Sequence, residues 1–165
     1  MWYAILGAVL LAGDQILKYW VVTHLAVGES APFLPGFMQL TRLHNYGAAW
    51  SSFSGRTVLL VVFTAVLLAV VALLLLKKVV RHWTGITACT LILSGGIGNI
   101  IDRIVHGYVV DMFDLQLFSY PVFNLADCCV VVGAILGGVY YLFLYDKYDK
   151  KEKESDHAHD PSDPS

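Results

Sequence analysis

The stretch FNLADCCVVVGAILGGVYYLFLY, residues 123–145, places two opposing demands on the fold. From Cys128 onward it is apolar and uncharged, and its length is close to the roughly 20 helical residues that cross a bilayer. Its first part holds Asn124 and Asp127, although an ionised carboxylate inside a membrane costs at least a few kcal/mol. Asp127 must therefore lie near water, have a partner or take part in chemistry.

Three further segments have the composition of membrane spans. They cover about residues 2–22, 58–76 and 84–105, and the segment that holds Asp127 covers about 122–145. The chain is 57% hydrophobic, against about 45–50% in typical soluble domains. The sequence therefore predicts an all-α membrane protein in which four transmembrane helices form a single domain, residues 1–145.

Lysine and arginine residues predict how the bundle is oriented. The short link between the second and third spans holds Lys77, Lys78 and Arg81, and four lysines follow the fourth span. The longer links, 23–57 and 106–121, hold two arginines between them. Because cytoplasmic loops carry an excess of Lys and Arg, both termini are predicted to be cytoplasmic and the two longer links extracytoplasmic.

The first extracytoplasmic link is predicted to carry local structure, and the end of the chain is not. Residues 37–43, FMQLTRL, alternate between apolar and polar side chains, which indicates a short strand. Residues 48–53, AAWSSF, predict a surface helix anchored at the interface by Trp50 and Phe53. Residues 146–165 carry seven of the 13 acidic residues and few apolar ones, and they predict a disordered cytoplasmic tail.

Polar residues of three spans are expected to meet in the outer part of the membrane. At about 1.5 Å of rise per helical residue, the polar positions of the first, third and fourth spans reach a similar depth. The link that carries Asp111 joins two of these spans there. The expected cluster contains Asp14, Lys18, Asn99, Asp102, Arg103, Asp111, Asn124 and Asp127.

Two roles for this cluster remain open at the level of the residues. Polar side chains hold membrane helices together, which would account for Asp14 with Lys18 and for Asp102 with Arg103. Asp111 and Asp127 have few cations near them in sequence, so a chemical task is favoured for this pair. Two neighbouring carboxylates share a proton and can act as general acid and general base, as in aspartic peptidases.

A proton-coupled transporter is the alternative function, because transporters also keep buried carboxylates. Transporters commonly have internal repeats and a site at the midplane of the membrane, whereas this sequence shows no repeat and a cluster biased to one side. No metal-binding motif of the H-E-x-x-H type is present, and neither a metal nor another cofactor is expected.

Small residues predict close contact between the third and fourth spans. SGGIG, residues 94–98, lies in the third span, and Gly133 with Gly137 forms a G-x-x-x-G step in the fourth. A groove for substrate lined by these glycines is the alternative interpretation. The three cysteines lie within spans and are expected to be small core residues: Cys89, Cys128 and Cys129.

Five short motifs in register resemble those of the bacterial lipoprotein signal peptidases, the type II signal peptidases. The match extends along nearly the whole chain before the tail. Two departures are small: Cys128 follows Asp127 where the family often has Ser, and Leu125 precedes Ala126 where Val is commoner. The motifs are DQILK (14–18), NYGAAW (45–50), GGIGNIIDR (95–103), GYVVDMFD (107–114) and FNLAD (123–127).

The resemblance implies specific roles for residues of these motifs. Asp111 and Asp127 match the catalytic pair of the family. The residues expected to bind substrate or support the site are Asp14, Lys18, Asn45, Gly47, Asn99, Asp102, Arg103 and Asn124.

The resemblance also implies a substrate and a place in the cell. The substrate is a prolipoprotein whose cysteine already carries diacylglycerol, and cleavage occurs just before that cysteine at the outer surface of the bacterial inner membrane. The expected partners are this substrate and membrane lipid, with no nucleic acid, and the enzyme is expected to be a monomer.

Overall fold

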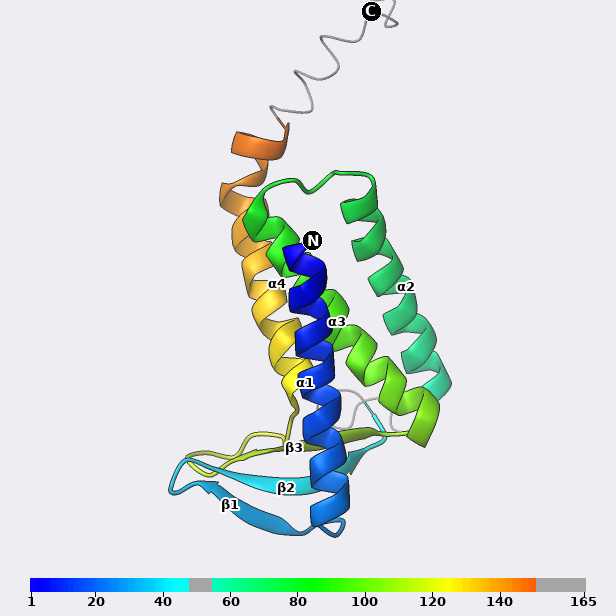
Figure 1. The fold of residues 1–165 in the computed structure, drawn as a ribbon, viewed down its shortest axis with the longest axis vertical. Coiled ribbons are helices and arrows are strands. Elements are labelled where there is room, and N and C mark those ends of the chain that lie inside the picture. Colours follow the sequence, from blue (N-terminus) through cyan, green and yellow to red (C-terminus); the bar gives the residue numbers. More distant parts are fainter. Residues whose placement is uncertain (48–54, 151–165) are drawn as a thin grey trace, which may run out of the picture.

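The computed structural model describes residues 1–47 and 55–150. Within them lie four helices that are long and apolar enough to cross a membrane, which confirms the predicted fold class (Figure 1). Each helix end lies within three residues of the predicted position. The helices are α1 (Trp2–His24), α2 (Thr57–Leu76), α3 (Trp83–His106) and α4 (Leu125–Phe143).

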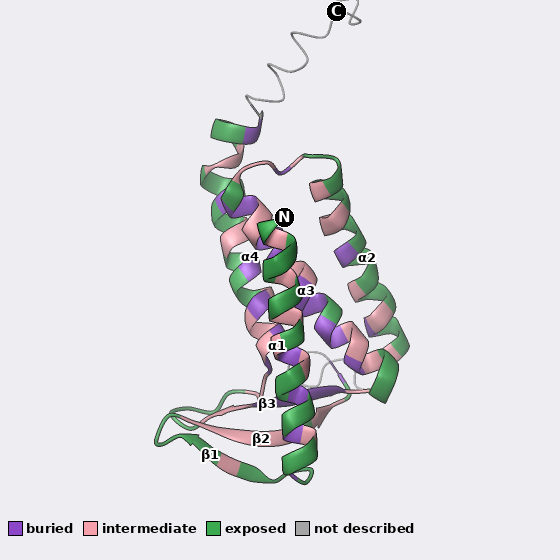
Figure 2. Ribbon diagram, viewed as in Figure 1, coloured by how far each residue is buried: buried purple, intermediate pink, exposed green. Residues whose placement is uncertain are grey.

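Helix α3 is the centre of the bundle. It packs against all three other helices, and 56% of its apolar window is buried, against 11–22% in the others. Most outward residues of α1, α2 and α4 are exposed (Figure 2), as expected of helices that face lipid. In α2 only Leu60 and Leu68 are buried.

Glycines bring α3 and α4 together, as the sequence predicts. A Cβ atom added at Gly95 would lie 2.3 Å from the Ala126 carbonyl oxygen, and one at Gly133 would lie 2.9 Å from that of Ala88. Gly137 has only an ordinary contact at 3.8 Å, so Gly133 is the residue of the G-x-x-x-G step that permits the close approach. The glycines therefore serve helix packing rather than a substrate groove.

A three-stranded antiparallel sheet lies at one end of the bundle, beside the last turns of α1 (Figure 1). Its strands, in spatial order, are β1 (Ser30–Leu34), β2 (Met38–Asn45) and β3 (Val109–Leu115). The strand predicted at 37–43 is confirmed by β2. Arg42 joins this sheet to α1, because its Nη1 donates to the carbonyl oxygens of Val22 and Leu25 at the end of that helix, at 3.0 and 2.9 Å.

Strand β3 was not foreseen within the link 106–121. Val109 to Met112 are all buried, so the strand lacks the apolar-polar alternation that marks a half-exposed strand. The reason is that both faces are covered. Val110 and Met112 pack on Val21 and Leu25 at the end of α1, whereas Asp111 contacts polar residues on the other face.

The predicted start of the tail needs a correction. Residues Asp146–Lys150 form a π-helical turn, so the helical chain continues past position 145. Asp149 is buried and accepts hydrogen bonds from the backbone N–H groups of Arg81 and His82, which lie just before α3. This contact holds the turn in place. The predicted surface helix at 48–53 and residues 151–165 lie outside the described residues.

Candidate active site

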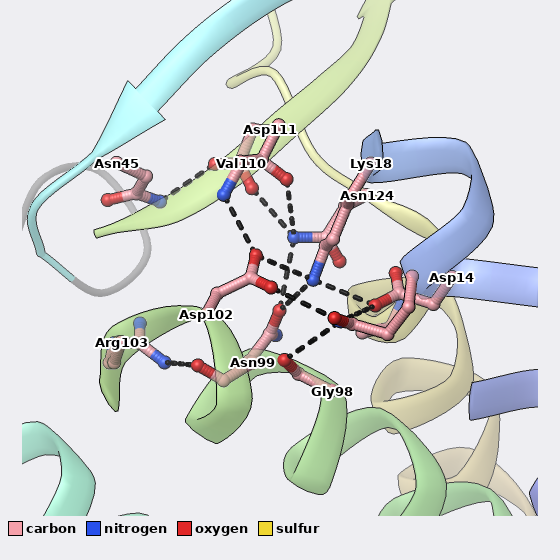
Figure 3. A network of polar contacts seen from close by, with 12 residues as sticks. Asp14, Lys18, Asn45, Gly98, Asn99, Asp102, Arg103, Val110, Asp111 and Asn124 are labelled. Atoms are coloured by element: carbon pink, nitrogen blue, oxygen red, sulfur yellow. Dashed lines mark hydrogen bonds and ion pairs between the residues drawn. The ribbon is translucent and has the colours of Figure 1, made fainter. Parts of the chain in front are cut away.

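The predicted polar cluster forms where the helical bundle meets the sheet (Figure 3). Helix α1 contributes two of its members, α3 three, β3 one and the N-cap and first turn of α4 one each, and Asn45 joins them from the end of β2. Every residue predicted to act in or support the site takes part in one connected network of hydrogen bonds and ion pairs: Asp14, Lys18, Asn45, Gly47, Asn99, Asp102, Arg103, Asp111, Asn124 and Asp127.

One part of the network is a buried ionic triad. The Lys18 Nζ atom lies 2.8 Å from Asp14 Oδ2 and 3.0 Å from Asp102 Oδ2, with each side chain at most 4% exposed. The i, i+4 spacing of Asp14 and Lys18 on α1 produces the first contact. The single Lys18 ammonium therefore compensates the charge of one of the two carboxylates in the triad.

The triad also fixes backbone of two other elements. Asp14 Oδ1 accepts from the Ala126 N–H of α4 at 2.9 Å, and Asp102 Oδ2 accepts from the Val110 N–H of β3 at 3.0 Å. Gln15, which was not among the predicted site residues, donates to Asp14 Oδ2 and to Asp102 Oδ1, each at 3.2 Å. Its place beside Asp14 in the DQILK motif was the available signal.

The second part of the network holds Asp111. This side chain is 1% exposed, and each of its oxygens accepts one amide hydrogen bond. Asn124 Nδ2 donates to Asp111 Oδ1 at 2.7 Å, and Asn45 Nδ2 donates to Asp111 Oδ2 at 2.8 Å. Asp111 is thus held by neutral donors from α4 and β2.

Asp127 is held at the start of α4 by a capping box. Asn124 is the N-cap residue, and its Oδ1 accepts from the Asp127 N–H at 2.8 Å, while Asp127 Oδ2 accepts from the Asn124 N–H at 3.3 Å. The other oxygen, Oδ1, accepts from Asn99 Nδ2 at 2.7 Å. The N-terminus of a helix stabilises negative charge, so this position suits a carboxylate.

The orientation of each asparagine amide is fixed by a partner that can only donate. The Gly47 N–H donates to Asn45 Oδ1 at 2.9 Å, and the Lys18 ammonium donates to Asn99 Oδ1 at 3.1 Å. The Asp127 N–H donates to Asn124 Oδ1 in the same way. Each NH₂ group must therefore face a carboxylate.

Asp111 and Asp127 have no ion pair among residues 1–47 and 55–150. Arg103, the cation nearest to the pair in sequence, donates to the carbonyl oxygens of Gly47 and Asn99 instead, at 2.9 and 3.4 Å. Burial, together with the charge of Asp127, raises the pKa of Asp111 to about 7, although the hydrogen bonds from Asn45 and Asn124 oppose this shift. The arrangement can hold one proton at neutral pH.

Asp114 lies three residues from Asp111 but has a separate environment. It accepts from Gln39 Nε2 at 2.7 Å and from Thr41 Oγ1 at 3.0 Å, both on β2. These contacts stabilise the sheet, and Asp114 shares none of the hydrogen bonds that join Asp111 to Asn45 and Asn124.

The fold and the site together define a class: a multi-pass membrane protein with a carboxylate pair that is held by asparagines at one end of its helices and makes no ion pair among the described residues. Comparison with known proteins gives the family. A family model described as signal peptidase (SPase) II matches residues 6–143. The lipoprotein signal peptidase of Enterococcus faecalis is 39% identical over 151 residues, which cover 92% of this chain and 93% of that protein.

Further relatives agree. The lipoprotein signal peptidase of Lactococcus lactis subsp. lactis is 40% identical over 143 residues, covering 87% of this chain and 91% of that protein. A bacterial membrane enzyme solved at 2.3 Å has a TM-score of 0.80 and 30% identity, with 91% of this chain and 92% of that chain covered. The chain belongs to the signal peptidase II family, which confirms the resemblance and the predicted protease activity.

Proposed function

We propose that this chain removes the signal peptide from diacylglyceryl-modified prolipoproteins by cutting just before the lipidated cysteine. The relatives named lipoprotein signal peptidase support the substrate class. The observation that carries the chemistry is the pair Asp111 and Asp127, whose oxygens accept hydrogen bonds from three asparagines and which makes no ion pair among the described residues. The transporter alternative is not favoured, because these relatives are named as peptidases.

The environments of the two carboxylates divide their roles. Asp111 is buried on β3 and is the member that holds the proton, whereas Asp127 lies at the positive end of α4 and is the ionised member. Asp127 takes a proton from a water molecule whose oxygen attacks the scissile carbonyl carbon, and Asp111 donates its proton to the carbonyl oxygen.

The tetrahedral intermediate then collapses. The proton on Asp127 passes to the leaving nitrogen as the carbon–nitrogen bond breaks, and a hydroxyl proton of the intermediate returns to Asp111 as the new carboxyl group forms. The signal peptide leaves with the new carboxyl group, and the lipidated cysteine keeps the new amine. Both carboxyl groups return to their starting protonation states.

Depth in the membrane supports the proposed substrate. Asp127 is the third residue of α4, so it lies about 3–5 Å along the helix from its start at the edge of the sheet. Diacylglycerol on the cysteine would hold the scissile bond near the membrane surface at this level. An unlipidated precursor should be cut more slowly, because fixing the reacting bond in place can lower a barrier by several kcal/mol.

The orientation of the bundle completes the proposal. The link between α2 and α3, which holds Lys78 and Arg81, lies at the end of the bundle opposite the sheet, the same end as the N-terminus and the turn Asp146–Lys150 (Figure 1). By the positive-inside rule this end is cytoplasmic and the carboxylate pair faces outward from the inner membrane. A cysteine placed at Glu29 should react with an impermeant thiol reagent in spheroplasts, and one placed at Lys78 should not.

A direct assay tests the function. The purified protein is incubated with a diacylglyceryl-modified prolipoprotein and with its unlipidated form, and the shorter product is followed by gel mobility and mass. We expect cleavage before the cysteine in the lipidated substrate and much slower cleavage in the other. Equal rates would refute the lipid requirement, and no cleavage of either would refute the proposed activity.

A further inference from the structure

A second site lies in the half of the bundle away from the carboxylate pair. A cavity of about 700 Å³ has α3 as its floor, α1 and the end of α2 as its walls, and Lys78 and Arg81 at one end. This volume lies within the range of about 300–1,000 Å³ that is usual for small-molecule sites. The Thr90 and Ser94 hydroxyls in the floor donate to carbonyl oxygens of α3 itself, at 2.8 and 3.0 Å, so the floor presents an apolar surface.

The cavity is separate from the carboxylate pair. Ile97 lines it, whereas Asn99, two residues later on α3, donates to Asp127. With 3.6 residues per turn, two residues are about 200° apart, so the cavity and the pair lie on opposite faces of α3. A signal peptide lying in this cavity would not bring its scissile bond to Asp127.

The length of the cavity fits one leaflet of a bilayer. Its floor runs from Ile86 to Ile97, which is about 16 Å at 1.5 Å per residue. The hydrocarbon core of a bilayer is about 30 Å thick. The apolar part of the cavity therefore matches the acyl region of a single leaflet, with its charged end at the level of the headgroups.

The charged end has an unusual backbone. Lys78 has φ 52°, and no other non-glycine residue in the described ranges has a positive φ. It follows the C-cap of α2, where glycine is the common residue because a side chain is strained in this conformation. Its ammonium has no hydrogen bond or ion pair within the described ranges, and its carbonyl oxygen accepts from Arg81 Nε at 3.2 Å.

We propose that this cavity binds an anionic phospholipid, with the acyl chain along α3 and the headgroup phosphate on the Lys78 ammonium. Basic pockets between transmembrane helices at the cytoplasmic side are typical sites for acidic lipid headgroups. The positive charge also argues against a signal peptide as occupant, because the first region of a signal peptide is itself positively charged. The proposal does not depend on the proposed cleavage reaction.

Native mass spectrometry of the full chain in detergent tests this site. Phosphatidylglycerol and phosphatidylcholine with the same acyl chains are titrated separately, and the fraction of protein carrying one lipid is measured. We expect phosphatidylglycerol to bind at a several-fold lower concentration. Lys78→Gln should weaken its binding by about fivefold, which corresponds to about 1 kcal/mol per lysine. Lys77→Gln, one residue away and outside the cavity lining, should change it little.

Further variants separate the headgroup from the acyl part. Lys78→Gly relieves the backbone strain and removes the ammonium, so it should weaken phosphatidylglycerol binding without loss of thermal stability. Ala8→Phe fills the cavity and should reduce binding of both lipids, whereas Val9→Phe on the neighbouring face of α1 should not. Equal binding of the two lipids, or unchanged binding in Lys78→Gln, would overturn the proposal. So would displacement of the lipid by inorganic phosphate or by a synthetic signal peptide.

Discussion

The network contains two pairs of aspartates, and the pairs differ in whether they form ion pairs. Asp14 and Asp102 share the Lys18 ammonium, and their remaining contacts are with backbone N–H groups and Gln15. Asp111 and Asp127 receive only amide and backbone donors. The difference teaches that one pair of buried aspartates, Asp14 and Asp102, can fix the positions of helices, while the neighbouring pair, Asp111 and Asp127, can hold a proton.

The ion-paired aspartates support the other pair. The Lys18 ammonium that lies between Asp14 and Asp102 also donates to Asn99 Oδ1, which turns the Asn99 NH₂ group toward Asp127. The triad thus acts through Asn99 on the orientation of a donor at the proposed pair. We therefore propose that Lys18 acts as a positioning residue, through Asn99.

The largest expected effect follows removal of either member of the pair. Asp111→Asn and Asp127→Asn should each lower the rate of cleavage by about 10²–10⁴-fold or more, since 10²–10⁴-fold is the contribution typical of general acid–base catalysis. The double variant should be little worse than either single one, because residues that act as a unit are not additive. Cleavage of a lipidated prolipoprotein, measured beside thermal unfolding of each variant, tests this.

Stability sharpens the same test. Asp111 has no ion pair to lose among the described residues, so Asp111→Asn should cost no more than the loss of one buried hydrogen bond, about 1–3 kcal/mol, while activity is lost. A large loss of stability in this variant, or full activity in either single variant, would remove the distinction between the two pairs.

The second effect concerns the triad. Lys18→Met leaves two buried carboxylates without their cation, which should cost about 3–5 kcal/mol of stability. Thermal unfolding in detergent measures the loss. Lys77→Met, at an exposed position at the end of α2, is the control and should stay within about 0.5 kcal/mol of the parent. A stable Lys18→Met variant would mean that the triad does not need its cation.

The third effect is a shift in pH dependence. Burial and the charge of Asp127 raise the pKa of Asp111 to about 7, and the proposed mechanism needs the protonated form. Activity should therefore fall as pH rises through this value. In Asn45→Ala the carboxylate form loses a donor, so the pKa of Asp111 should rise further and the alkaline limb of kcat/KM should move to higher pH. A shift toward lower pH would contradict the proposed assignment of the proton.

Much of this arrangement could be predicted from sequence. Long apolar runs with polar breaks gave the four spans, because a bilayer leaves few alternatives to helices of that length. The spacing of Asp14 and Lys18 is sufficient to predict their contact, since residues four apart share a helix face. The rise per residue along the third and fourth spans predicted that Asn99 and Asp127 lie at a similar depth in the membrane.

Other features could not be predicted, because they depend on contacts between distant elements. Strand β3 lacks alternation because it is covered on both faces, and the role of Gln15 requires α1 and α3 to be docked. The sequence around Asp149 predicts a charged tail, and its contact with the N–H groups of Arg81 and His82 is seen only in the folded chain. The amide orientations that aim three asparagines at the pair also appear only in the folded network.

The smallest expected effects lie at two neighbours of the pair. Asp114→Asn should retain most activity, because Asp114 bonds Gln39 and Thr41 on β2 and shares none of the hydrogen bonds that hold Asp111. Cys128→Ser should also remain active, since the thiol beside Asp127 has no part in the proposed proton transfers. Both variants are measured with the same lipidated substrate and the same unfolding assay as the parent.

These two variants separate the carboxylate pair from its nearest rivals. A thiol nucleophile would make Cys128→Ser inactive although the fold is intact, and the proposed mechanism would then be wrong. An essential Asp114 beside a dispensable Asp111 would shift the reacting carboxylate to the opposite end of β3, away from Asn124 and the first turn of α4. Asp111 and Asp114 lie three residues apart on one strand but have different hydrogen-bond partners. Their comparison therefore tests whether the partners, rather than the position near the membrane, define the site.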